Sequence, residues 1–325
     1  MSNTGNEFLV LSDAEMERMA VSQEDIVTAI EGAIRAEARG DVWTAPKSAV
    51  LPGDGRYIMT TLSASDSPGF TVTKSVMVSP CNPQRGLPSI DGSIVLHDSE
   101  TGALKAVLQA GWVTAVRTAG LSAVVARRLA NPKARSVAFI GCGVQARSHL
   151  AAFRALFPLE EVRAFGRGPG NRKRLCALAE EHRLSAQDCT TPREALEGAD
   201  LVVSSVTLSF ESEPFLDAAW LKPGAFATVT DAATPWHSAS LSAFDAIVID
   251  DRAQERASGK KMVPSNLVAG DCKDLVVGSL DLRFRPDRRT AFVFRGLAIG
   301  DFALACLAYR RANETGAGKR LSMGA

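Results

Sequence analysis

Residues Ser136-Val-Ala-Phe-Ile-Gly-Cys-Gly-Val-Gln-Ala-Arg-Ser-His149 decide the fold of this chain. The first five have the composition of a buried strand and run directly into Gly141-x-Gly143-x-x-Ala146, after which a helical pattern begins. In a dinucleotide-binding fold the first glycine makes a tight turn, the second lets the backbone approach a pyrophosphate, and the small third residue lets helix and strand pack closely. Because the helix N-terminus then faces the phosphate charge, the stretch predicts a nucleotide-binding turn.

Strands and helices alternate from this turn onward. The expected strands are at 136–140, 161–165, 200–206, 225–230 and 246–250. The expected helices are at 145–157, 171–183, 192–198 and 251–258. This βαβ order predicts an α/β fold with a Rossmann-type, doubly wound parallel sheet.

The part of the chain before the turn has a different pattern. A helical pattern at 23–39 precedes four short alternating runs that are separated by turn residues. The runs predict antiparallel strands at 57–62, 70–78, 90–97 and 103–108. A long helical pattern at 111–130 ends at Asn131-Pro132, which we take as the crossing between two domains. Residues 297–311 predict a final helix, and we expect the last dozen residues to fray.

Composition narrows the classes of partner. The 325 residues are 46% hydrophobic and 22% charged, and the net charge of +1 predicts neither nucleic acid nor an anionic membrane as a partner. No apolar run approaches the roughly 20 residues of a membrane span, and the N-terminus lacks the pattern of a signal peptide. Six scattered cysteines are typical of reduced thiols, and four histidines form no ligand cluster. We therefore expect a cytoplasmic protein without a metal site.

The end of the second expected strand bears on the choice of cofactor. NAD sites usually place an acidic residue there for the ribose hydroxyls, but the strand Glu161-Val-Arg-Ala-Phe165 ends in Gly166-Arg167. An arginine at this point can hold a 2′-phosphate, so the sequence favours NADP(H) over NAD(H); alternatively, Arg167 is a solvated loop residue. Thr207 follows the strand at 201–206, where it either meets the cofactor or caps a turn.

Several further motifs occur in collinear order from about residue 8 to 313. They are Gly141-x-Gly-x-Gln-Ala-x-x-His149, Thr73-Lys74, Gly86-Leu-Pro-Ser with Asp98-x-x-Thr-Gly102, Arg117-Thr-Ala-Gly120, Asp231, and Gly296-x-Ala298-x-x-Asp301. Together they resemble the signature of the ornithine cyclodeaminase/mu-crystallin family. The resemblance implies a nucleotide-binding domain at 131–298 and a discontinuous β-rich domain at 1–130 and 299–325, which binds substrate and pairs in a homodimer.

The members of this family act at the α-carbon of an amino or imino acid and use NAD(P). The resemblance implies that Lys74 and Arg117 bind the α-carboxylate of the substrate and that Arg117 also lies near the nicotinamide. With the glycine loop, the full set of expected cofactor contacts is Ser89, Arg117, Thr118, Gly141, Gly143, Val144, Gln145, Gly166, Arg167, Thr207 and Asp231.

The surroundings of the two cations agree with such a role. Lys74 shares a strand face with Phe70, Val72, Val76 and Val78, so its face is expected to be buried and to require an anionic partner. The alternative is an exposed face or a structural ion pair. The second cation, at position 117, lies in an otherwise apolar helix, where a guanidinium suits bidentate carboxylate binding. The alternative is that Arg117 lies at the edge of the helix and does not bind a carboxylate.

Asp231 follows the strand at 226–230, at the sheet edge where Rossmann folds bind ligands. Imine reduction needs hydride at carbon and a proton at nitrogen, and a carboxylate can stabilise the cationic nitrogen and relay the proton. Spacing alone favours a turn-capping aspartate in Asp231-Ala-Ala-Thr-Pro235, whereas the resemblance favours a catalytic one.

Three positions depart from the family pattern. Lys47 stands where a carboxylate-binding arginine is usual, and Thr234-Pro-Trp-His237 stands in place of a P-x-K element that touches the cofactor. Arg295 falls where a small apolar residue is usual beside the substrate side chain. A cation there would repel an ammonium group and favour an acidic substrate, unless Arg295 turns outward to solvent.

These observations predict an NAD(P)H-dependent reductase of an imino acid, of the ketimine or iminosuccinate type, which could also run in reverse as an amino-acid dehydrogenase. Asp231, Lys74 and Arg117 are the expected catalytic residues, and Lys47, Lys74, Arg117 and Arg295 the expected substrate contacts. The alternatives are an ornithine cyclodeaminase-type ammonia-lyase that recycles bound NAD⁺ internally, and a binding protein of the crystallin type without turnover.

Overall fold

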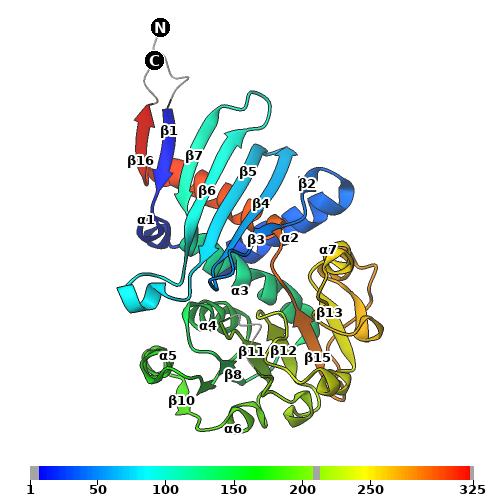
Figure 1. Ribbon diagram of the computed structural model, residues 1–325. Coiled ribbons are helices and arrows are strands. Elements are labelled where there is room, and N and C mark those ends of the chain that lie inside the picture. The colour runs from blue at the N-terminus through cyan, green and yellow to red at the C-terminus, as the bar shows by residue number, and fades with distance from the viewer. Residues whose placement is uncertain (1–6, 208–212, 323–325) are drawn as a thin grey trace. The chain divides into compact units, whose positions relative to one another are not determined.

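The computed structural model of the protein describes residues 7–207 and 213–322 (Figure 1). The chain divides into two compact units, Met1–Arg117 with Leu297–Ala325 and Thr118–Gly296. The first boundary lies inside helix α3 (Ala110–Leu129), earlier than the expected crossing at Asn131-Pro132.

The first unit contains a mixed sheet with the strand order β16-β1-β7-β6-β5-β4-β2, and β3 also pairs with β4. Its strands are β1 (Glu7–Leu11), β2 (Val42–Thr44), β3 (Ser48–Val50), β4 (Tyr57–Asp66), β5 (Gly69–Val78), β6 (Ile90–Asp98), β7 (Leu104–Gln109) and β16 (Lys319–Ser322). Its helices besides α3 are α1 (Asp13–Arg18), α2 (Gln23–Arg39) and α9 (Ala298–Thr315). Helix α9 packs against β4 and β5 and contacts α2.

The four alternating runs of the sequence form β4 to β7, and their pairing is antiparallel as predicted. The expectation that the C-terminus frays is wrong for the described residues. There, β16 pairs antiparallel with β1, and β1 pairs parallel with β7, which makes the sheet mixed. The Lys-Arg-Leu-Ser sequence of β16 forms an exposed edge strand, so it carries no buried alternation that the sequence could reveal.

The second unit contains a parallel sheet with the order β10-β9-β8-β11-β12-β15-β13-β14. Its strands are β8 (Ser136–Ile140), β9 (Glu161–Phe165), β10 (Ser185–Asp188), β11 (Leu201–Ser204), β12 (Phe226–Val229), β13 (Ala246–Ile249), β14 (Val268–Asp271) and β15 (Thr290–Val293). Its helices include α4 (Val144–Leu156), α5 (Pro169–Glu181), α6 (Pro192–Leu196), α7 (Arg252–Ala257) and α8 (Cys272–Val277). The predicted α/β, doubly wound architecture is confirmed. The strand order reverses between β8 and β11, and such switch points are where these sheets bind ligands.

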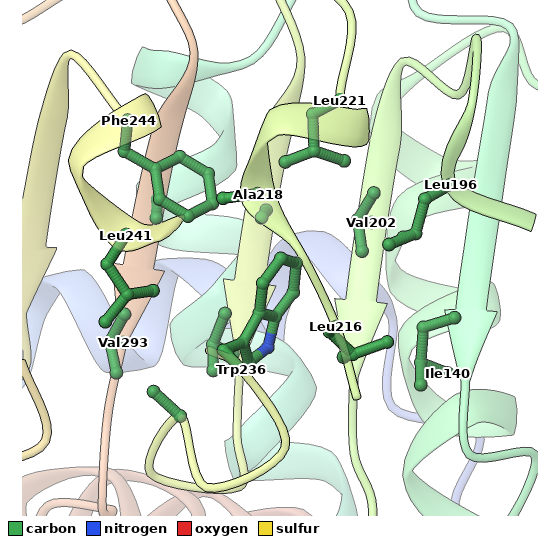
Figure 2. Close-up of a cluster of buried hydrophobic side chains, with 14 of the residues drawn as sticks. Ile140, Leu196, Val202, Leu216, Ala218, Leu221, Trp236, Leu241, Phe244 and Val293 are labelled. Carbon is green, nitrogen blue, oxygen red and sulfur yellow. The ribbon is translucent and has the colours of Figure 1, made fainter. Parts of the chain in front are cut away.

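A large apolar cluster packs on this parallel sheet (Figure 2). Trp236, which is 2% exposed, lies in it together with Leu216, Leu241 and Phe244. The cluster includes Ala233 and Trp236 of the segment that follows β12, and it therefore holds this part of the sheet edge where a ligand would bind.

Within the described ranges, none of the helices has both the length and the apolar character needed to cross a membrane.

Candidate functional site

The turn between β8 and α4 has the geometry that a pyrophosphate requires. Gly141 has φ +92°, and a Cβ on it would lie 2.6 Å from the carbonyl oxygen of Ser205, so a side chain is excluded on two grounds. Gly143 is the N-cap of α4, and no side chain caps the N–H groups of the first turn. The space beside Gly143 is open, so these donors and the helix dipole are available to an anion.

A cavity of about 450 Å³ opens beside this turn. Of the predicted cofactor contacts, Gly141, Gly143, Gly166, Arg167 and Thr207 line it. The other lining residues are Ile140, Cys142, Phe165, Gly168, Asn171, Ser205, Val206, Phe215, Thr234 and Pro235. The cavity lies wholly within the second unit and fits the proposed dinucleotide turn.

The remaining predicted cofactor contacts lie outside this lining. Val144 and Gln145 form the first turn of α4, and Thr118 is buried in α3. Ser89 and Arg117 belong to the first unit. Their contacts with a cofactor stay predictions.

A neighbouring arginine binds the backbone of the loop after β9. Arg172 donates to the carbonyl of Gly166 and pairs with Asp188, while the side chain of Arg167 is exposed at the cavity. The strand ends as the sequence predicts, with Gly166-Arg167 and without a carboxylate.

Asp231 follows β12 at the carboxyl edge of the sheet and is 1% exposed. Its Oδ2 accepts hydrogen bonds from the Ser204 hydroxyl and from the Val206 N–H, which is 3.1 Å away. Its Oδ1 has no hydrogen-bond partner among the described residues. Val206 lines the cavity, so the aspartate is anchored directly to the cavity wall.

The environment of Asp231 is suited to proton transfer near neutral pH. Burial raises the carboxyl pKa to about 6, although Ser204, Val206 and the backbone N–H groups of Asp231 and Ala233 act in the opposite direction. The two residues that follow, Ala232 and Ala233, both adopt left-handed backbone conformations, with φ +55° and +57°. Non-glycine residues in this region carry strain, which tends to occur at functional sites.

The first unit contains a buried cluster of charges centred on Asp301 of α9. Lys74 of β5 is 1% exposed, and its Nζ lies 2.6 Å from Oδ1 of Asp301. The Nε of Arg117 in α3 lies 3.2 Å from the same oxygen, but no hydrogen bond to this Nε is formed among the described residues. The Thr61 hydroxyl of β4 donates to Oδ2 at 3.0 Å. The predicted burial of Lys74 and its anionic partner are observed, and the exposed face is excluded. The structural ion pair, which was the other alternative, has the same geometry, so substrate binding by Lys74 stays a prediction.

Two cations share one carboxylate, so the cluster carries a net positive charge. Desolvation lowers the pKa of Lys74 to about 8, and the opposite charge of Asp301 limits the fall. Burial tends to raise the pKa of Asp301, but Lys74 and Arg117 overcome this and hold it below its usual value. A desolvated cluster with excess positive charge can bind a substrate carboxylate. Asp301 is a site residue that sequence reasoning missed, although the motif Gly296-x-Ala298-x-x-Asp301 pointed to it.

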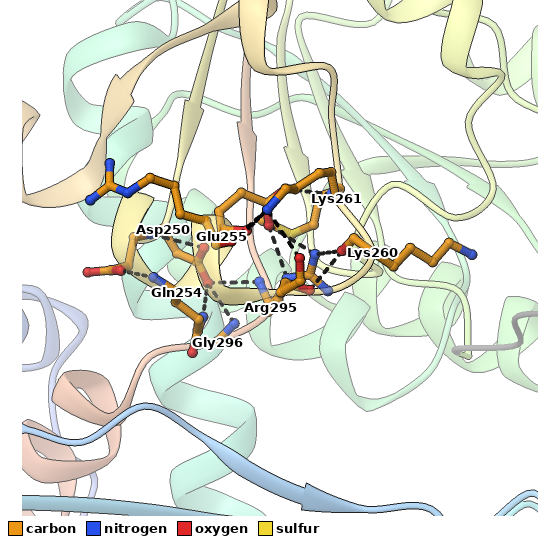
Figure 3. A network of polar contacts seen from close by, with 11 residues as sticks. Asp250, Gln254, Glu255, Lys260, Lys261, Arg295 and Gly296 are labelled. Carbon is orange, nitrogen blue, oxygen red and sulfur yellow. Dashed lines mark hydrogen bonds and ion pairs between the residues drawn. The ribbon is translucent and has the colours of Figure 1, made fainter.

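The two other predicted substrate contacts have different surroundings. Lys47 lies between β2 and β3, close enough for its charge to lower the pKa of Lys74. Arg295 pairs instead with Glu255 of α7, at 3.2 Å from Nε and 2.9 Å from Nη2 (Figure 3). It also donates to the carbonyl of Lys260. Its charge is therefore matched by a carboxylate within the same unit.

His149, the last residue of the glycine-loop motif, is fully buried and has a structural environment. Its Nδ1 lies 2.7 Å from the carbonyl of Gln145, and its Nε2 lies 2.9 Å from the Ser122 hydroxyl. Because a carbonyl only accepts, Nδ1 carries the proton. Burial lowers the pKa of His149 to about 4, so the neutral ring ties α4 to α3.

No group of three or more histidine, cysteine, aspartate or glutamate side chains in the described part of the chain could hold a metal ion.

The family model for the ornithine cyclodeaminase/mu-crystallin family matches residues 6–316. The chain belongs to this family. The resemblance predicted from the motifs is thereby confirmed over almost the whole length.

Two named proteins and one solved structure are similar to most of this chain. The alanine dehydrogenase of Archaeoglobus fulgidus is 28% identical over 97% of this chain and 98% of its own. The Delta(1)-pyrroline-2-carboxylate reductase 1 of Burkholderia multivorans is 30% identical over 71% of this chain and 73% of its own. A solved archaeal alanine dehydrogenase dimer with bound NAD superposes with a TM-score of 0.85 at 26% identity, and the match covers 98% of this chain and all of that one.

Proposed function

We propose that this family member catalyses the NAD(P)H-dependent reduction of an imino acid to an L-amino acid, and the reverse oxidation. It is an oxidoreductase that acts on CH–NH or CH–NH2 groups, the class to which its named relatives belong. The observation that carries the proposal is Asp231, a fully buried carboxyl with one oxygen anchored to the nucleotide cavity and the other without a protein partner.

The chemistry needs three groups with different tasks. A bound nicotinamide dinucleotide supplies or accepts the hydride at the substrate α-carbon. Lys74 and Arg117 bind the α-carboxylate, because their cluster has one more positive than negative charge. In amine oxidation the Asp231 carboxylate takes the proton from the substrate ammonium, and in reduction it returns that proton to the nitrogen.

From the sequence, Arg295 favoured an acidic substrate, but the proposed function does not include this preference. Its guanidinium is bound to Glu255, so a substrate carboxylate would have to compete with an existing ion pair. A preference for acidic over neutral imino acids stays a prediction, and comparing an Arg295→Val enzyme on both kinds of substrate tests it.

We further propose that the protein prefers NADP(H) and acts as a homodimer in the cytoplasm. Arg167 supports the cofactor preference, because it is exposed at the cavity where other dinucleotide sites place an acid. The dimer follows the archaeal relative, which is a dimer in its solved structure. All six cysteines are free thiols, as a reducing compartment requires.

The decisive experiment measures NAD(P)H oxidation at 340 nm with 2-oxo acids plus ammonia or methylamine, and with pyrroline- and piperideine-2-carboxylate. We expect turnover with at least one imine and its loss in Asp231→Asn. Ammonia release from ornithine without a net change at 340 nm would instead identify a cyclodeaminase. Tight nucleotide binding without turnover on any of these compounds would identify a binding protein.

A further inference from the structure

The segment Thr234-Pro-Trp-His237, which departs from the family pattern, has a defined place next to the aspartate. The backbone N–H of Trp236 bonds to the carbonyl of Ala233, the second left-handed alanine. The indole ring packs in the apolar cluster with its centroid 5.9 Å from the ring of Phe244 (Figure 2). The backbone hydrogen bond therefore holds the residue, and packing in the apolar cluster holds its ring.

The polar edge of this ring is directed to the strand that supports the site. The indole N–H donates to the Ser204 hydroxyl oxygen at 3.2 Å. Ser204 ends β11, is fully buried, and donates its own hydroxyl proton to Oδ2 of Asp231. A serine hydroxyl has a single proton, so a donor on its lone pair favours the orientation in which that proton points to the carboxylate. The two hydrogen bonds form a chain that ends on one carboxylate oxygen, and the hydrogen bonds in such a chain strengthen one another.

The two oxygens of Asp231 therefore have unlike environments. Oδ2 accepts from Ser204 and from the Val206 N–H, whereas Oδ1 has no partner in the described ranges. Of these two donors, the Val206 N–H is fixed in the backbone, whereas the Ser204 hydroxyl can rotate about its Cβ–Oγ bond. Holding Oδ2 fixes the direction in which Oδ1 faces.

We propose that Trp236 is a positioning residue for Asp231: its indole N–H orients the Ser204 hydroxyl, which holds Oδ2 and leaves Oδ1 to exchange a proton with the substrate nitrogen. This inference rests on the proposed function, in which Asp231 is the proton-transferring group. The proton passes from the substrate ammonium to Oδ1 during oxidation and returns during reduction. A bound nicotinamide dinucleotide would accept or supply the hydride at the α-carbon, so the reaction would need no further oxidant or reductant.

The matched pair of variants is Trp236→Phe and Trp220→Phe. Both remove an indole N–H beside the same apolar cluster, but only Trp236 donates to Ser204. We expect Trp236→Phe to lower kcat about 3- to 10-fold and to leave the KM for the nucleotide unchanged. The acid limb of the kcat/KM profile for amino-acid oxidation should move up by about 0.3–1 pH unit, because the carboxylate loses stabilisation. We expect Trp220→Phe to change neither quantity.

A double-mutant cycle tests whether the tryptophan acts through the serine. In a Ser204→Ala background the further change Trp236→Phe should have no additional effect on kcat, whereas Ser204→Thr, which keeps a hydroxyl, should restore most of the activity. Additive losses in the two variants would mean that Trp236 acts through packing alone and would overturn the proposal.

A direct titration separates this inference from the proposed function. The carboxyl ¹³C resonance of Asp231, assigned by its absence in Asp231→Asn, should titrate near pH 6 in the wild type and at higher pH in Trp236→Phe. This readout needs no turnover. An unchanged titration would refute the positioning role even in an active enzyme, whereas a shifted titration in a protein inactive on every imine would refute only the proposed function.

Discussion

Asp231 is an ionisable side chain that folding removes from water almost completely, and this has a cost in stability. Because burial raises its carboxyl pKa to about 6, the folded protein holds the proton more tightly than the unfolded chain does. The carboxyl is neutral in both states well below pH 4, so the cost is absent there; it grows as the pH rises from about 4 to about 6 and stays constant above that.

We therefore expect Asp231→Asn to raise the free energy of unfolding by about 1–3 kcal/mol at pH 8 and to change it little at pH 4. The same change should lower the rate of imine reduction at least about 100-fold. Thermal unfolding at the two pH values measures the first effect, and Asp281→Asn, at a side chain that is 84% exposed, is the control. A gain of equal size at both pH values would show that ionisation is not its cause.

Asp301 determines the net charge of the buried cluster that it forms with Lys74 and Arg117. Without its negative charge, Lys74 would be a buried cation beside Arg117, and its pKa would fall below the present value of about 8. For Asp301→Asn we expect a loss of about 3–5 kcal/mol in stability at pH 7. The KM for the carboxylate substrate should begin to rise at a pH at least about one unit lower than in the wild type. Thr61→Val removes a neutral partner of the same carboxylate and should leave the pH profile in place.

At the scale of the secondary-structure elements, local patterns predicted most of the fold. The bounds of β8 and β9 agree with the prediction to the residue, because their apolar side chains and the adjacent glycines are local signals. By contrast, β10 and β14 read Ser-Ala-Gln-Asp and Val-Ala-Gly-Asp, which have no strand pattern of their own. They form because a neighbouring strand offers its backbone groups, which is a tertiary effect.

The same distinction between local patterns and tertiary effects applies to the residues of the candidate site. The burial of Lys74 was predictable because this residue interrupts an apolar strand face. For Asp231 the local spacing favoured a turn cap, and only the family resemblance pointed to a catalytic role. The links through Asp301, Ser204 and Trp236 join residues 227, 27 and 32 positions apart in sequence. Only the folded arrangement reveals them.

The loop after β9 makes a prediction at the level of one element. Arg167 faces the cavity, whereas Arg174 is exposed on α5 outside the lining. In Arg167→Ala we expect NADPH to bind roughly tenfold more weakly, because its 2′-phosphate loses a charged contact. We expect the affinity for NADH to be unchanged, because NADH has no 2′-phosphate. Fluorescence titration of both nucleotides measures this, with Arg174→Ala as the control. Equal weakening of both nucleotides would contradict a role in 2′-phosphate recognition.

At the scale of the whole molecule, the first unit has a sheet face suited to self-association. Thr61 points to α9, so its neighbour Leu62 points to the opposite face, where it is 44% exposed. Trp43 of β2 pairs with Ala64 in register and shares that face, and it is 53% exposed. Two large apolar side chains beside each other on one sheet face are unfavourable in water, and a second copy of the chain would cover them.

We expect light scattering coupled to size-exclusion chromatography to give twice the chain mass of 34.5 kDa for the wild type. Leu62→Asp and Trp43→Asp should shift the population to the monomer, because a dimer would bury the new charges without partners. Val277→Asp introduces the same charge at a side chain that is 41% exposed on α8 of the second unit, and we expect this variant to remain dimeric. Dimers in all three variants would place the contact elsewhere, and a monomeric wild type at micromolar concentration would refute the homodimer.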